Sequence, residues 1–129
     1  MSLDVSPQLL EQAERDAIED REFVQCVRTS LPYAYDLIDR LVLEFRTGEA
    51  PFAGNNIPPP DERARGQLLR ALASNSIRGA LERHFGVTLA FQNCHKAAVF
   101  DAEPDEAAYR DFTSERAQIL NQSPELVDC

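Results

Sequence analysis

The sequence predicts a single α+β domain in which four to five helices and a small antiparallel β-hairpin pack on a central long helix. Two patterns indicate this fold class. Apolar residues recur at helical spacing over residues 61–85, and two short segments of strand-like composition follow at 87–91 and 96–100. A chain of 129 residues, 43% of them hydrophobic, is about one domain and can bury its own core. We therefore treat residues 1–129 as one unit.

Residues 1–20 are expected to form a short N-terminal helix. Ser6 is a natural N-cap and Pro7 suits the first helical position, while Leu9, Leu10 and Ala13 give one apolar face.

Residues 20–45 carry the most regular apolar pattern. Pro32 interrupts it, which favours two helices that meet at an angle, the second of them capped by Ser30. The apolar residues of positions 24–45 form a seam, the 24–45 seam. It packs either on the 61–85 helix of the same chain or on a second subunit or partner helix. Its candidate interface residues are Val24, Val27, Leu31, Ile38, Leu41 and Phe45.

Residues 47–60 are rich in Gly, Pro and Asn and are predicted to form one long loop. A loop of this length serves as a lid or as a spacer, and Phe52 and Ile57 are its two apolar anchors. It contains no P-loop and no G-x-G-x-x-G phosphate signature.

The central helix has clear boundaries. Three prolines at 58–60 precede it, Asp61 can accept hydrogen bonds from its first turn, and Gly86 can end it in the left-handed conformation. A hairpin follows over residues 87–100. A last helix is predicted over 105–120, with Thr113 and Ser114 as a point of division, and the polar tail 121–129 is expected to be loose.

The acidic charge of the chain disfavours two classes of partner. The net charge of -9 opposes nucleic-acid binding and attraction to anionic membranes, although residues 61–85 carry +2 and residues 101–129 carry -6. Three widely spaced cysteines favour a reducing compartment. Because no signal-peptide pattern and no membrane-spanning apolar run are present, we expect a cytoplasmic protein.

Cys94 and His95 are the one pair of adjacent metal-binding residue types. Neighbouring residues of a strand point to opposite faces, and no C-x-x-C spacing occurs, so the sequence predicts no metal site and no cofactor. No G-x-S-x-G motif or carboxylate couple marks a catalytic residue. A ligand pocket between the 47–60 loop and the 87–100 hairpin would be lined by Phe52, Asn93, Cys94 and His95.

Several blocks of the chain resemble a known group of proteins. These are the opening MSLDVSPQLLEQAER and the segments PPPDERARGQLLRALAS, IRGALERHFGV, FQNCHKAAVF and LNQSPELVDC. They are similar to a family of small hypothetical proteins of streptomycetes and related actinobacteria. The resemblance implies a single-domain intracellular bacterial protein and carries no activity, cofactor or catalytic residue.

The sequence therefore favours a non-enzymatic interaction or regulatory module, with a homodimer as one option because of the long seam and the isolated hairpin. The alternative is a small-molecule binder or enzyme that uses the pocket next to the 47–60 loop. Nucleic acid is the least favoured partner.

Overall fold

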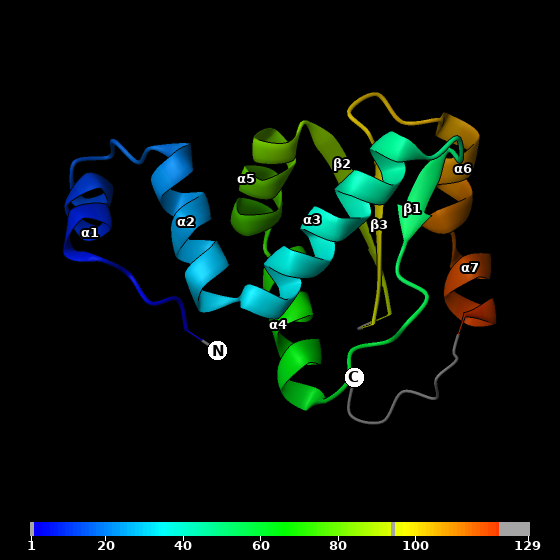
Figure 1. Ribbon diagram of the computed structural model, residues 1–129, viewed down its shortest axis with the longest axis horizontal. Helices are drawn as coiled ribbons and strands as arrows, with labels where there is room; N and C mark the ends of the chain where they lie inside the picture. The colour runs from blue at the N-terminus through cyan, green and yellow to red at the C-terminus, as the bar shows by residue number, and fades with distance from the viewer. Residues whose placement is uncertain (1, 94, 122–129) are drawn as a thin grey trace.

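The computed structural model describes residues 2–93 and 95–121 (Figure 1). In this part of the chain there are seven helices and a three-stranded sheet, which confirms the α+β class but exceeds the four to five helices expected. The helices are α1 (Pro7–Glu14), α2 (Asp20–Ser30), α3 (Pro32–Thr47), α4 (Glu62–Leu72), α5 (Asn75–Phe85), α6 (Glu106–Phe112) and α7 (Glu115–Leu120). The strands are β1 (Phe52–Gly54), β2 (Val87–Gln92) and β3 (Lys96–Asp101).

The sheet has the order β1-β3-β2, and both strand pairs are antiparallel. The predicted hairpin is confirmed as β2 and β3, in which Leu89 lies opposite Val99. The third strand, β1, comes from the segment that was expected to be a loop, and Phe52 pairs with Phe100. The same chain therefore completes the hairpin, and no second subunit is needed for that purpose.

The two faces of the sheet pack against different helices because side chains alternate along each strand. Leu89 and Val99 belong to the main core, which also includes buried residues of α2, α3, α4 and α5. Ala98 and Phe100 point to the other face and pack with Phe112 of α6. Figure 1 shows α1 and α2 at one end of the molecule and α6 and α7 at the other.

The central long helix predicted over residues 61–85 is in fact two helices. The start at Asp61 is confirmed, since its carboxylate accepts from Ala64 N at 2.8 Å, and Gly86 ends the second helix with φ +66°. Between them, Ser74 caps α5 by accepting from Ile77 N at 3.3 Å. Arg78 Nη1 then donates to the terminal carbonyl of α4 at Leu72, at 2.8 Å. These two bonds satisfy helix-end groups that a continuous helix would not expose.

The predicted break at Pro32 is present, but its cap differs from the expectation. Ser30 is the last residue of α2, and its hydroxyl accepts from Asp4 N instead of capping α3. The free N–H groups of the first turn of α3, at Tyr33 and Ala34, donate to Gln67 Oε1 of α4 at 2.7 and 3.3 Å. The cap of α3 is thus supplied by another helix.

The candidate interface residues of the seam lie within the core of the chain. Five of them are buried and Phe45 packs at the margin of the same cluster, as the intramolecular alternative expects. The five buried residues, which a second subunit could reach only by opening the core, are Val24, Val27, Leu31, Ile38 and Leu41, whereas Phe45 keeps part of its surface exposed.

The ends of the chain follow the prediction in part. The N-terminal helix begins after the Ser6 cap but ends at Glu14. The last helix is divided at Thr113 and Ser114, as the sequence suggested. Of the tail predicted at 121–129, residues 122–129 lie outside the described residues.

No helix among those described combines the length and apolar character that crossing a bilayer requires.

Replacement of Gln67 by Leu should destabilise the fold. Gln67 is 5% exposed, so the change leaves two N–H groups of α3 without their acceptor, which costs about 1–3 kcal/mol for each buried group. Urea unfolding should show a lower midpoint with an unchanged slope. Gln8→Leu, at an exposed position of α1, is the matched control and should leave the midpoint unchanged. Equal midpoints for all three proteins would contradict the capping role.

The Asp20–Arg83 ion pair should make stability depend on pH. It joins α2 to α5 at 2.8 Å, and its hydrogen bond lowers the pKa of Asp20 below 3.8. A lowered carboxyl pKa gives stability that is present above the unfolded-state value and is lost as pH falls through the lowered one. Asp20→Asn should therefore be slightly less stable than wild type at neutral pH and equal to it in strong acid. Asp111→Asn, at an exposed position of α6 that forms no ion pair with another described residue, is the matched control and should have wild-type stability at both pH values.

Candidate functional site

The residues predicted to line a pocket lie in three different settings. Phe52 stacks on Phe100 with ring centroids 5.0 Å apart, in the small aromatic core beneath α6. Asn93 forms the β2–β3 turn with φ +53° and hydrogen bonds to groups near the end of α7. His95 is 5% exposed, and its carbonyl accepts a bond from Asn55. Cys94 lies outside the described residues.

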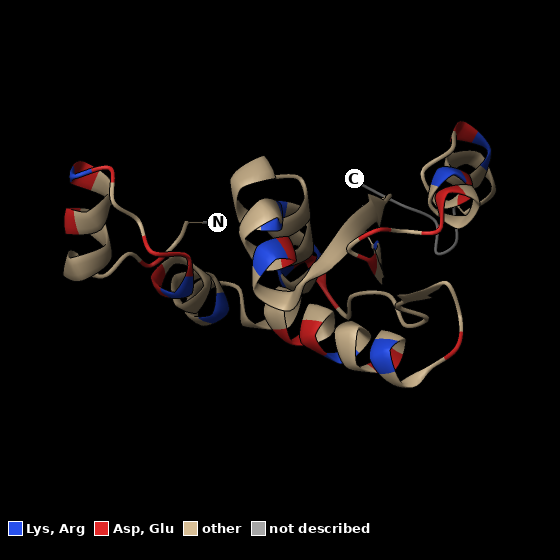
Figure 2. Ribbon diagram, turned by 90° about the horizontal axis from the view of Figure 1, so that it is seen from above, with Lys and Arg blue, Asp and Glu red and all other residues tan. Residues whose placement is uncertain are grey.

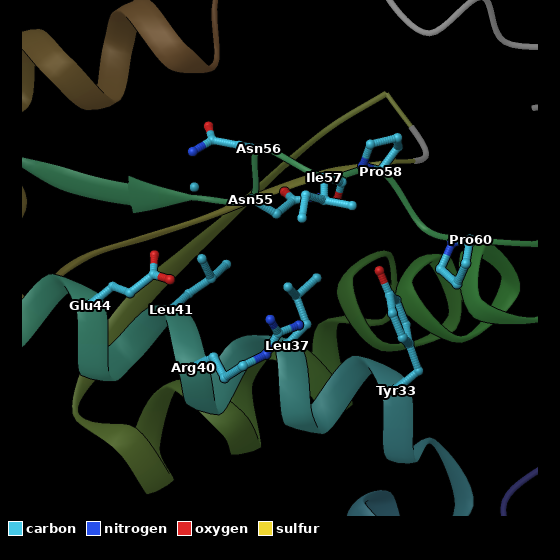
Figure 3. Close-up of a pocket in the computed structure, with 11 residues that line it drawn as sticks. Tyr33, Leu37, Arg40, Leu41, Glu44, Asn55, Asn56, Ile57, Pro58 and Pro60 are labelled. Carbon is cyan, nitrogen blue, oxygen red and sulfur yellow. The ribbon is translucent and has the colours of Figure 1, made fainter.

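A groove lies on another side of the 47–60 segment, facing α3 (Figure 3). Its volume is about 350 Å³, which is within the range of small ligand sites. We call it the α3 groove. One wall consists of residues 54–58 and Pro60, and the other of Tyr33, Leu37, Arg40, Leu41 and Glu44.

The α3 wall follows from helical spacing, because its members recur at intervals of three and four residues. Figure 3 shows Tyr33, Leu37 and Leu41 pointing from α3 toward the opposite wall, where Ile57 lies above Leu37. Leu37 and Leu41 are almost fully buried, so they serve the core and the groove floor together. Ile57, expected to anchor the loop, is 79% exposed at the rim.

The opposite wall is held in place by the buried side chain of Asn55. Its Nδ2 donates to the carbonyls of His95 at 2.7 Å and Ile57 at 3.2 Å, and its Oδ1 accepts from Ala97 N at 2.8 Å. The preceding residue, Gly54, lies so close to β3 that an added Cβ would stand 3.2 Å from Ala97 O. The amide of Asn55 thus continues the β1–β3 ladder after the strand ends and fixes the wall.

Two ionic side chains stand at the groove. Arg40 and Glu44 are exposed, and neither forms an ion pair with another described residue. Burial raises the pKa of Tyr33, and this effect outweighs the opposing influence of Arg40. The phenol therefore remains protonated at neutral pH and can donate a hydrogen bond. The groove offers an apolar floor, a cation, an anion and a neutral donor.

The groove contains no nucleophile paired with a base. Elsewhere, Tyr35 Oη lies 3.4 Å from His84 Nε2, but burial raises the pKa of Tyr35 and keeps its hydroxyl protonated. Among the residues that the structure describes, no three His, Cys, Asp or Glu side chains are grouped to hold a metal ion. The arrangement can bind a ligand through apolar contacts, a hydrogen bond from Tyr33 and the charges of Arg40 and Glu44.

Asn55→Ala should loosen the groove wall. The change leaves Ala97 N and His95 O without their buried partners, which should lower the free energy of unfolding by at least about 2 kcal/mol. Hydrogen exchange at Ala97 should accelerate more than exchange in α2. Asn56→Ala, at the exposed neighbouring position, should change stability by less than about 0.5 kcal/mol. If both variants had the same stability, the role of Asn55 would be refuted.

Comparison with known proteins gives one family. No curated protein and no solved structure gives a significant match. A family model described as "NucS shadow ORF", whose name begins with the letters KH, matches residues 1–129. Because the match spans the whole sequence, the chain belongs to the NucS shadow ORF family.

Proposed function

We propose that the chain is a non-enzymatic interaction module of the actinobacterial cytoplasm that binds a short segment of a protein partner in the α3 groove. The observation that supports this proposal is a buried apolar floor, at Leu37 and Leu41, beside two ionic side chains, Arg40 and Glu44, that pair with no other residue in the described part of the chain. Apolar contacts supply affinity, and charged groups at the edge supply specificity.

The length of the groove fits a peptide. The positions from Tyr33 to Glu44 span about 16 Å along α3, at 1.5 Å for each residue. An extended chain advances about 3.3 Å for each residue, so about five residues would fill this length. The wall fixed by Asn55 is formed before binding, which lowers the entropic cost of ordering the site.

A homodimer through the 24–45 seam receives no support from the position of these residues. The seam is closed against the chain's own core, and β1 supplies the strand that the hairpin lacked. Both features that favoured self-association are satisfied within one chain. The proposal therefore assigns the α3 groove to a different protein.

Nucleic acid is a less favoured partner. The letters KH also denote an RNA-binding module that clamps the nucleic-acid backbone with a G-x-x-G loop. No G-x-x-G occurs in this sequence, and the net charge is -9. Basic residues are dispersed among acidic ones along the helices (Figure 2). Binding of a phosphate backbone requires clustered basic side chains.

A small-molecule ligand is the second candidate, because the groove volume of about 350 Å³ also suits a compact ligand. Tyr33 and Arg40 could then hold a carboxylate. Selection of peptides from a random library and screening of a metabolite library against the same protein separate the two candidates. Saturable binding of peptides supports the first candidate, and binding of metabolites alone supports the second.

Ile57→Asp should weaken binding of the selected peptides about tenfold or more. Ile57 is highly exposed and lies over the groove, so the change places a charge against the apolar floor without removing a core contact. Fluorescence anisotropy with labelled peptides measures the loss. Leu43→Asp is the matched control, because Leu43 is 64% exposed on α3 and does not line the groove. If the two variants bound equally well, the peptide site would lie elsewhere.

A further inference from the structure

The order of groups along the α3 groove defines the kind of peptide that it can bind. From the N-terminal end of α3 the wall presents Tyr33 and Leu37, then Arg40, then Glu44. The first two are an aromatic and an aliphatic side chain, of which Leu37 lies beneath Ile57, and the last two carry opposite charges. This arrangement rests on the groove of the proposed function and adds the chemistry of its partner.

We infer that the α3 groove binds an extended peptide with an apolar, an acidic and a basic side chain at alternate positions, facing Tyr33/Leu37, Arg40 and Glu44 in that order. The groove sets the order of the three side chains, and either chain direction satisfies it. The occupant is a linear segment of a partner protein with this alternating pattern.

The spacing of the wall residues along α3 matches the spacing of alternate side chains along an extended peptide. Arg40 and Glu44 are separated by about 6 Å along the helix axis, since four residues rise 1.5 Å each. An extended peptide places every second side chain on the same face, about 6.6–6.8 Å apart. The midpoint between Tyr33 and Leu37 lies about 7.5 Å before Arg40 on the same axis. Three alternate peptide side chains therefore meet the three parts of the wall in register.

The charges fix the order. Arg40 and Glu44 have no ionic partner among the described residues, so an acid opposite Arg40 and a base opposite Glu44 would each gain a partner. At the other end, Asp61 is near enough to Tyr33 to raise its pKa, and this charge disfavours an acidic peptide residue there. The apolar side chain is left to the end formed by Tyr33 and Leu37.

Four blocked pentapeptides test the order. Leu-Ser-Asp-Ser-Lys has the matching order, Leu-Ser-Lys-Ser-Asp has the charges exchanged, and the reversed sequence of each covers the opposite chain direction. Blocked ends remove the terminal charges. Exposed ion pairs each change affinity about two- to fivefold, so the better matching peptide should bind about tenfold more tightly than its charge-exchanged counterpart at low salt. NMR titration measures both affinity and the residues that respond.

The double variant Arg40→Glu/Glu44→Arg is the decisive control. Both side chains are exposed and the net charge does not change, so folding should be unaffected. This variant should reverse the preference and select the charge-exchanged peptides. Equal affinities for wild type, the absence of binding by all four peptides, or an unreversed preference in the double variant would overturn the inference.

Different results would refute the peptide site in the α3 groove and the pattern assigned to the peptide. If Ile57→Asp abolishes binding of library-selected peptides while charge order has no effect, the peptide site stands and the assigned pattern is refuted. If peptides bind but the NMR shifts occur away from Tyr33, Leu37 and Arg40, the α3 groove itself is refuted as the site. Leu43→Asp, at an exposed position outside the groove, should bind each peptide as the wild type does.

Discussion

The fold depends on hydrogen bonds to the backbone N–H and carbonyl groups that are buried where the sheet ends. β1 has only three residues, so beyond its end the buried N–H of Ala97 in β3 and the buried carbonyl of His95, just before β3, need other partners. The side chain of Asn55 takes over these bonds, accepting from Ala97 N and donating to His95 O. The same amide positions residues 54–58 opposite α3. One buried side chain thus completes the sheet and builds the wall of the groove.

Local signals explain what the sequence could predict. The Asp61 cap, the left-handed Gly86, the break at Pro32 and the β2–β3 hairpin each depend on residues within one turn or one strand pair. The division of the 61–85 helix was missed because the apolar residues before and after Ser74 stay on one stripe, so periodicity alone does not reveal the break. Its signal was the Ser-Asn-Ser cluster at 74–76, in which Ser74 acts as a cap.

Interactions between distant residues explain what the sequence could not predict. β1 is a strand because it pairs with β3, more than forty positions further along the chain, and Gln67 caps α3 across a gap of 34 positions. The expected pocket assumed that the 47–60 segment and the hairpin meet across a cavity. At Asn55 the two are joined directly, because its amide bonds to His95 O and Ala97 N. The α3 groove lies on another side of the 47–60 segment, where no single motif marks it.

On the proposed peptide partner, the overall charge and the groove would act at different ranges. A net charge of -9 favours encounter with basic proteins over a distance of several ångströms, and salt weakens this attraction. Within the groove, Arg40 favours an acidic side chain at one position, because it is a cation without an ionic partner in the described chain. A basic partner that carries one acidic side chain in an extended segment satisfies both requirements. General attraction would then raise the rate of encounter, while the acidic residue opposite Arg40 and the basic residue opposite Glu44 would set the register in which the segment binds.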